Sequence, residues 1–94
     1  METQIAFIKI KEGKMDEAID ILKEIVPNVR NSEPDTKIYI AYTLKGDKNT
    51  IFFYEVYENK KAMDEHMSKL PQIMGKIFPL IEGAPDIKPC KEII

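Results

Sequence analysis

The residues best suited to chemistry gather in one stretch of the chain, from Thr50 to Met67. Glu55 is a carboxylate inside an otherwise apolar segment, IFFYEVY, and His66, the single histidine, follows eleven residues later. A carboxylate that its neighbours predict to be buried is unfavourable unless it is paired or protonated. A histidine can accept or donate a proton near neutral pH. Acid–base chemistry on a small molecule is therefore one function that these two residues suggest.

Glu55 has three alternative interpretations. Lys9 is the matching charge in another apolar segment, and a cross-sheet Lys9–Glu55 pair would explain both residues without any ligand. A carboxylate in a pocket could instead orient a histidine or a substrate hydroxyl. In the third alternative, Glu55 reaches solvent at the end of its strand.

His66 is expected at the edge of a helix, beside an apolar stripe that contains Met63 and Met67. A lone histidine at such an edge is commonly structural or exposed. The functional alternatives are a general base, or a ligand for an extended aromatic molecule or haem. One histidine and one cysteine, Cys90, are too few for a typical zinc site, so no metal is expected. The lone Cys90 cannot form an internal disulfide either.

Four tyrosines and four phenylalanines supply the aromatic side chains. Most of them are expected in the core, because aromatic side chains provide much of the burial in a small domain. Tyrosines that converge near Glu55 and His66 would line a pocket for a planar phenolic ligand. The candidate substrate-binding residues are Tyr39, Tyr54, Tyr57 and Phe78.

Length and charge exclude several classes of protein. The 94 residues are predicted to form one domain, residues 1–94. The 14 basic and 16 acidic side chains are interspersed and give a net charge of -2, which argues against a nucleic-acid partner. No apolar stretch is long enough to span a membrane, and the N-terminal residues lack a signal-peptide pattern. Together with a free thiol, these features predict a cytoplasmic protein.

Apolar periodicity predicts the elements that would position the candidate residues. Alternating or continuous apolar patterns indicate four strands, at residues 4–11, 37–44, 50–57 and 86–93. Spacings of three and four indicate helices at residues 15–29, 60–68 and from 71 to about 81. Pro27 should kink or end the first helix near Val26, and Asn59 is the expected cap of the second. Residues 45–49 are expected to be a hairpin loop.

The order strand, helix, strand, strand, helix, strand predicts the α+β class. The expected architecture is a ferredoxin-like split βαβ fold, a four-stranded antiparallel sheet with helices on one face. The first and third strands are the most apolar and should be central, whereas Pro89 indicates an edge or a bulge for the last strand. Because strands one to three are apolar on both faces, we expect a second copy to cover the free face in a homodimer.

Three segments together resemble the antibiotic biosynthesis monooxygenase (ABM) domain family over nearly the whole chain: IKIKEGKMDEAIDIL, NSEPDTKIYIAY and IFFYEVYENKKAMDEHM. The family pattern maps onto Glu33-Pro34, Tyr39, Tyr54-Glu55-x-Tyr57 and His66. The resemblance implies a dimeric α+β barrel. The chain departs from the pattern at Asp35, where the family has a turn glycine, and at Tyr57, where Trp is common. Leu70-Pro71-Gln72 stands where a second histidine is common.

The resemblance implies a cofactor-independent monooxygenase, in which a deprotonated phenol or quinol passes an electron to oxygen without a metal or flavin. His66 would be the base and Glu55 its orienting carboxylate. The absence of tryptophan, and of asparagine in the first strand, disfavours the haem-degrading chemistry of other members. The alternatives on the same fold are a small-molecule binding protein or isomerase, and a structural or regulatory dimer. A pocket that reaches both Glu55 and His66 would favour a ligand; a filled core with Lys9 paired to Glu55 would favour the last alternative.

Overall fold

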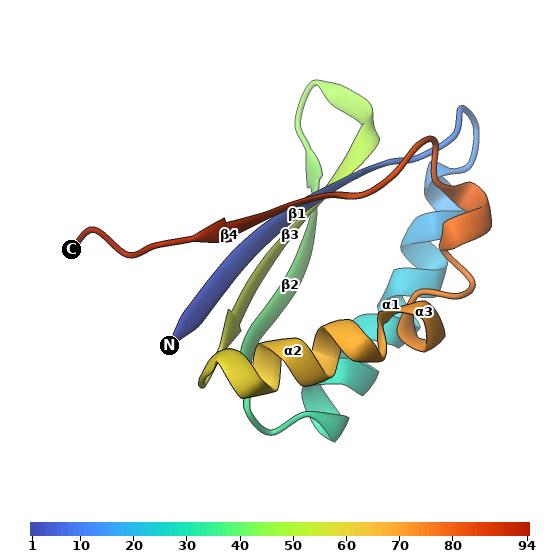
Figure 1. Cartoon of the computed structure of the whole chain (residues 1–94). Coiled ribbons are helices and arrows are strands. Elements are labelled where there is room, and N and C mark those ends of the chain that lie inside the picture. The colour runs from blue at the N-terminus through green and yellow to red at the C-terminus, as the bar shows by residue number, and fades with distance from the viewer.

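The computed structural model describes residues 1–94, which form a four-stranded antiparallel sheet with all helices packed on one face (Figure 1). The strands are β1 (Glu2–Lys9), β2 (Thr36–Leu44), β3 (Asp47–Tyr57) and β4 (Asp86–Cys90). The helices are α1 (Met15–Ser32), α2 (Lys60–Ser68) and α3 (Leu70–Ile73), followed by a 3-10 turn at Phe78–Leu80. This is the predicted α+β, ferredoxin-like arrangement.

The strand order in the sheet is β2-β3-β1-β4, so β1 and β3 are central as predicted. Pro89 lies in β4, which is an edge strand where a missing backbone donor is tolerated. The hairpin between β2 and β3 has a shorter connection than the five residues predicted. It turns at Lys45-Gly46, and Gly46 has a φ of 83°, a conformation that suits glycine.

The core lies between the sheet and α1. Alternate residues of the central strands point toward the helices, among them Ala6, Ile8, Ile51 and Phe53. They meet the apolar face of α1, where the buried residues recur at helical spacing: Ala18, Leu22, Val26 and Val29. Full burial of each large aliphatic side chain contributes about 1.5–3 kcal/mol, so this contact adds substantially to stability.

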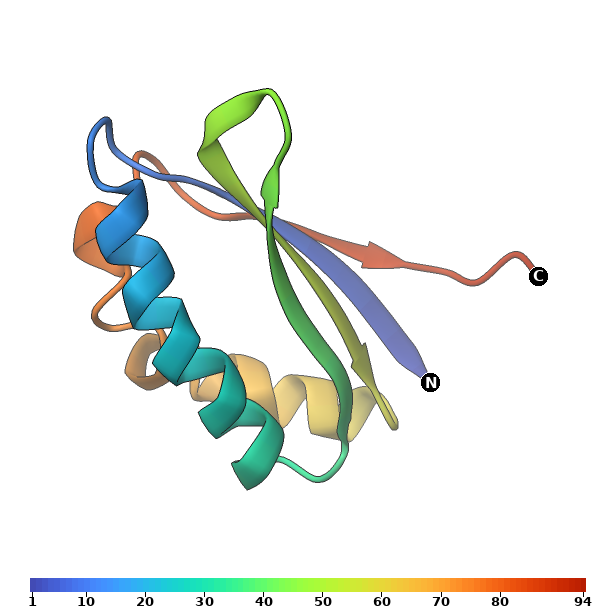
Figure 2. The ribbon, with the colours of Figure 1, turned by 180° about the vertical axis from the view of Figure 1, so that it is seen from behind.

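The opposite face of the sheet carries no helix (Figure 2). It is nevertheless rich in apolar side chains, with Ile5 and Phe7 on β1 facing the same way as Phe52 and Tyr54 on β3. The rings of Phe7 and Phe52 lie 5.1 Å apart between centroids. The homodimer that would cover this face stays a prediction. None of the helices is long and apolar enough to cross a membrane.

Two of the predicted helices have different bounds in the structure, beyond shifts of two to three residues at strand ends. Helix α1 continues through Pro27 to Ser32 instead of ending near Val26. Pro27 itself is exposed, while Val26 and Val29 on either side of it are buried, so packing against the sheet holds the helix together across the missing donor. The predicted helix from residue 71 is also interrupted, because α3 ends at Ile73 and the chain turns before the 3-10 segment.

Candidate functional site

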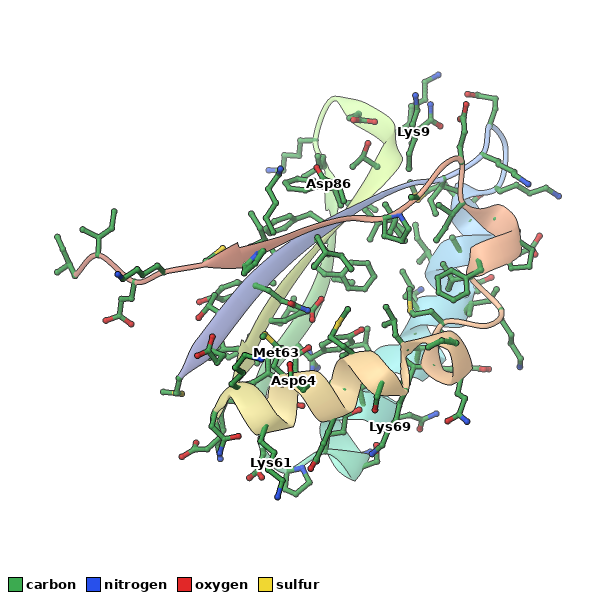
Figure 3. The ribbon with its side chains drawn as sticks, viewed as in Figure 1. Lys9, Lys61, Met63, Asp64, Lys69 and Asp86 are labelled. Atoms are coloured by element: carbon green, nitrogen blue, oxygen red, sulfur yellow. The ribbon has the colours of Figure 1, made fainter.

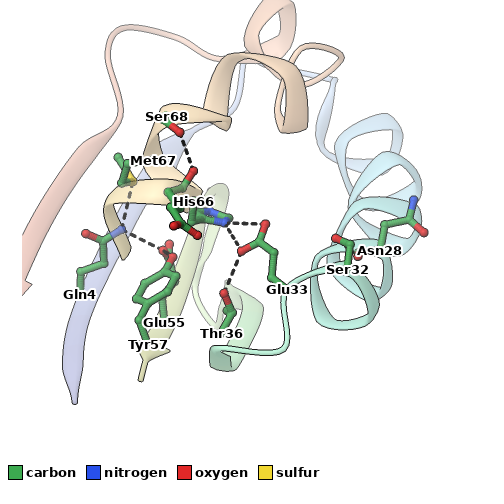
Figure 4. Close-up of polar contacts among 11 residues, drawn as sticks. Gln4, Asn28, Ser32, Glu33, Thr36, Glu55, Tyr57, His66, Met67 and Ser68 are labelled. Carbon is green, nitrogen blue, oxygen red and sulfur yellow. Dashed lines mark hydrogen bonds and ion pairs between the residues drawn. The ribbon is translucent and has the colours of Figure 1, made fainter. Parts of the chain in front are cut away.

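Glu55 lies on the helix-facing side of β3, where its side chain is only 5% exposed. Gln4 stands directly opposite on β1, and its Nε2 donates a hydrogen bond to Glu55 Oε1 at 2.9 Å. The hydroxyl of Tyr57, on the same face of β3, donates to the same oxygen (Figure 4). The buried carboxylate is therefore held by two neutral donors and has no cation beside it.

Lys9 does not pair with Glu55, which excludes this alternative for Glu55. Lys9 stands opposite Thr50 and is exposed at the far end of β1 (Figure 3). Gln4, the true neighbour of Glu55, is five residues away from Lys9, a separation of about 17 Å along a strand. Because five is an odd number, the Lys9 side chain also points to the opposite face of the sheet.

His66 is buried rather than exposed, with 1% of its side chain accessible. It lies one helical turn after Ala62 on the sheet-facing side of α2, whose start is capped by Asn59 Oδ1 accepting from the Ala62 amide at 2.9 Å, as predicted. The buried face of α2 is therefore shifted by one residue from the predicted methionine stripe. Ala62 and His66 are buried, whereas Met63 and Met67 are only partly buried.

The carboxylate that contacts His66 is Glu33, not Glu55 as predicted. His66 Nδ1 lies 2.9 Å and 3.1 Å from the two oxygens of Glu33, which also accepts a hydrogen bond from the Thr36 hydroxyl at 2.8 Å (Figure 4). A carboxylate only accepts hydrogen bonds, so Nδ1 carries the shared proton. The other ring nitrogen, Nε2, is buried and has no hydrogen-bond partner within the protein.

Two tyrosine rings connect the Glu55 and His66 contacts. The centroid of the His66 ring lies 5.1 Å from that of Tyr39 and 5.5 Å from that of Tyr57. Burial raises the pKa of both phenols far above the usual value of 10.0, and the nearby negative charge of Glu55 raises it further. Both hydroxyls therefore stay protonated and can serve as hydrogen-bond donors near neutral pH.

Glu55 and His66 open onto different pockets. Glu55 lines a narrow pocket of about 30 Å³ between the sheet and the α2–α3 segment, which is space for roughly two water molecules. Its walls are mainly apolar and include Tyr39, Phe53, Met67, Met74 and Phe78. His66 instead lines a polar pocket of about 170 Å³, together with Glu33, Thr36, Glu65 and Lys69. Tyr39 is the link, since it lines the first pocket and contacts the His66 ring.

The sequence-predicted residues are thus only partly brought together. Tyr39 and Phe78 line the Glu55 pocket and Tyr57 bonds to Glu55, but Tyr54 stands opposite Ile5 on the other face of the sheet. Sequence reasoning assigned no role to Gln4 or to the Glu33 side chain. The Glu33-Pro34 motif could have pointed to a role for Glu33. Gln4 could have been found because it is a polar residue in an apolar strand, as Glu55 is. No three His, Cys, Asp or Glu side chains cluster in a way that could hold a metal ion.

The sequence profile of a known family, antibiotic biosynthesis monooxygenase, matches residues 1–70. The chain belongs to this family. Membership supports monooxygenase activity at the level of the family and carries no information on the substrate. A comparison with curated proteins found no match.

Solved structures of ABM proteins share the fold. One antibiotic biosynthesis monooxygenase superimposes with a TM-score of 0.88 at 20% sequence identity, covering 100% of both chains. A Nitrosomonas europaea protein provisionally given the same name has a TM-score of 0.87 at 13% identity, again over 100% of both chains. A Caulobacter crescentus protein with that provisional name has a TM-score of 0.88 at 19% identity, over 99% of this chain and 90% of its own. At these identities the likeness establishes the fold alone.

Proposed function

We propose that this ABM protein is a cofactor-independent monooxygenase of a small phenolic or quinol-like substrate, which binds beside Glu55. One observation carries the proposal. Gln4 and Tyr57 both donate to Oε1 of Glu55, and the carboxylate lines an apolar pocket. Oε2 is therefore the oxygen left to accept a hydrogen bond, and then a proton, from a substrate hydroxyl.

The chemistry then needs only the substrate, oxygen and a base. The substrate O–H bond breaks as its proton passes to Glu55 Oε2, which leaves an electron-rich phenolate. The phenolate transfers one electron to O₂, and the resulting substrate radical and superoxide combine to a peroxide anion with a new C–O bond. The peroxide takes the proton back from Glu55. Loss of the hydrogen on the same carbon then breaks the O–O bond, so that one oxygen stays on the substrate as a carbonyl and the other leaves as water. Apolar walls favour this sequence because they keep water away from the anion and the radical pair.

Substrate entry requires the pocket to widen, because its present volume of about 30 Å³ is smaller than a phenol ring. Met67 and Met74 line the pocket, and methionine side chains are flexible enough to move aside at low cost. Phe78, which is 39% exposed, is a further wall residue with freedom to turn outward. We therefore expect small, planar substrates to bind better than extended ones.

The proposed active unit is a homodimer. Its support is the apolar sheet face that no helix covers, which includes Phe7, Phe52 and Tyr54. Exposed apolar surfaces of this kind mark interaction sites in proteins that are otherwise well packed. A second copy related by two-fold symmetry would bury the same surface on both partners.

The narrow pocket also favours a second candidate, a dimer that binds or isomerises a small molecule, or that serves only as a structural or regulatory unit. Oxygen uptake separates these alternatives. With a panel of small quinols, hydroquinone being the smallest, wild-type protein should consume oxygen faster than the protein-free reaction. Glu55→Gln keeps the size of the side chain but removes the base, so we expect uptake to fall by about 10²-fold or more.

The matched control is Glu58→Gln, which neutralises an exposed carboxylate three residues further along the chain. It should leave oxygen uptake unchanged. Uptake that is equal in wild type and Glu55→Gln would contradict the assignment of Glu55 as base. No uptake above the protein-free rate with any quinol would contradict the monooxygenase proposal.

A further inference from the structure

A long groove lies between α1 and the edge strand β2, apart from the pockets of Glu55 and His66. It has a volume of about 470 Å³, within the range of about 300–1,000 Å³ that is usual for small-molecule sites. Its α1 side runs from Ile19 to Arg30, which is roughly 16 Å at a rise of 1.5 Å per residue. No other helix or strand covers the groove on the side seen in Figure 2. It shares no lining residue with the Glu55 pocket, so what binds in it does not depend on the proposed function.

The walls of the groove are apolar along most of their length. Leu22, Val26 and Ile51 line it from the core side and are buried. Ile19 is half-buried, and the exposed ring of Pro27 adds apolar surface further along α1. An alkyl chain laid against these side chains gains free energy for every methylene group that it removes from water.

Two basic side chains, Lys23 and Arg30, line the same groove, and no acidic side chain does. They are seven residues apart, so they lie two turns from each other on the same face of α1. The ion pairs of the protein involve other residues, which leaves both cations without a carboxylate partner. Arg30 Nε donates a hydrogen bond to the Tyr39 carbonyl oxygen at 3.0 Å, which holds the guanidinium against β2. Its terminal N–H groups are left to donate, and their planar arrangement suits a carboxylate.

We propose that this groove is a binding site for a medium-chain fatty acid. The carboxylate meets the guanidinium of Arg30, with Lys23 as the second cation, and the alkyl chain follows the apolar walls toward Ile19. The length of the groove fits an extended chain better than a compact ring. Because its lining charges are all positive, the groove selects an acid over an alcohol or an amine of the same chain length.

Isothermal titration calorimetry at neutral pH tests the recognition of chain and charge, with octanoate as the probe. Octanoate should bind at one site per chain and at least about 10-fold more tightly than octanol, because only the acid forms charge-assisted hydrogen bonds. Butanoate, which has four methylene groups fewer, should bind at least about 10-fold more weakly than octanoate. Equal affinity for octanoate and octanol, or no saturable binding of octanoate, would overturn the proposal.

Substitutions identify the cations that are responsible. Arg30→Gln should weaken octanoate binding by about 10-fold, and Lys23→Gln by a smaller factor. The double variant should bind octanoate and octanol equally. The matched control is Lys61→Gln, which removes an exposed positive charge on α2 outside the groove and should leave octanoate binding unchanged. Equal losses in the control and in Arg30→Gln would show that net charge alone attracts the acid, and would overturn the site.

Isoleucine-labelled methyl NMR locates the bound acid, because isoleucines lie on each competing surface. Octanoate should shift the Ile19 signal in the groove and leave two others in place: Ile87, which lines the Glu55 pocket, and Ile5, which lies on the uncovered face of the sheet. Shifts at Ile87 or Ile5 without a shift at Ile19 would place the acid elsewhere and overturn the proposal. An Ile19 signal that moves with protein concentration in the absence of octanoate would show that a second copy occupies the groove, and would also overturn it.

Discussion

The hydroxyl of Tyr57 donates a hydrogen bond to the carboxylate of Glu55, two residues earlier on the same face of β3. Side chains two residues apart on a strand point the same way, so this contact is built into the strand itself. It gives a buried carboxylate a donor without a neighbouring cation. The buried carboxylate is therefore held by hydrogen bonds alone, without an ion pair.

Tyr57→Phe should destabilise the protein, because it removes one of the two donors to the buried Glu55. We expect the free energy of unfolding to fall by about 1.5–3 kcal/mol, the usual contribution of a hydrogen bond to a charged group. Urea unfolding followed by circular dichroism measures the change. Tyr54→Phe removes a hydroxyl on the opposite face of β3 and should change stability by less than about 0.5 kcal/mol. Equal effects of the two substitutions would contradict a structural role for the Tyr57 hydroxyl.

Stability should fall steeply above about pH 10. The raised pKa of Tyr39 and Tyr57 means that the folded state keeps both phenolic protons, whereas the unfolded state releases them near the usual value of 10.0. Above that pH the unfolded state binds fewer protons, so the free energy of unfolding falls as pH rises, by about 2.7 kcal/mol per pH unit for two groups. Below it their contribution is fully present.

Unfolding curves between pH 8 and 11, with tyrosinate absorbance as a second signal, check this pH dependence. The double variant Tyr39→Phe/Tyr57→Phe should lose most of the alkaline slope. An equally steep slope in that variant would show that other groups cause the loss.

Phe52→Lys should convert the proposed dimer to a monomer. Phe52 lies on the uncovered face of the sheet, where a lysine would place a buried charge in the proposed interface. Sedimentation velocity at micromolar concentration should give a dimer mass for wild type and a monomer mass for the variant. Phe78→Lys changes an exposed phenylalanine on the helical side and should remain dimeric. A monomeric wild type would contradict the proposed assembly.

Pro27→Ala should stabilise the protein. Proline in a helix interior is about 3 kcal/mol less favourable than alanine, and part of this is offset because proline also restricts the unfolded chain. Since Pro27 is exposed, we expect a net gain of about 2 kcal/mol in the free energy of unfolding. The neighbouring exposed Asn28→Ala should gain less than about 0.7 kcal/mol. A loss of stability in Pro27→Ala would show that the ring itself makes a favourable contact.

The sheet could be predicted from the sequence because period-two alternation determines which residues share a face. β1 and β3 are the most apolar strands and were correctly placed in the centre. Pro27 was misjudged because local propensity ignores the burial of Val26 and Val29, which holds the helix across the proline.

The candidate site was harder to predict because its contacts depend on register and on loop placement. Apolar patterns placed Lys9 and Glu55 in adjacent central strands, but only the register shows that Gln4 is the residue opposite Glu55. Glu33 lies beyond the end of α1, in a connection whose path the sequence does not specify. Its contact with His66 spans 33 residues and had no periodic pattern to reveal it.

The buried polar contacts join the two halves of the chain on either side of the Lys45-Gly46 turn. Gln4 and Glu33 come from the first half, and their partners Glu55 and His66 come from the second. If either half unfolds while the other remains, charged and polar side chains in the surviving half lose their partners. A half-folded state would lose both the Gln4–Glu55 and the Glu33–His66 contacts. We therefore expect the molecule to unfold in a single cooperative transition.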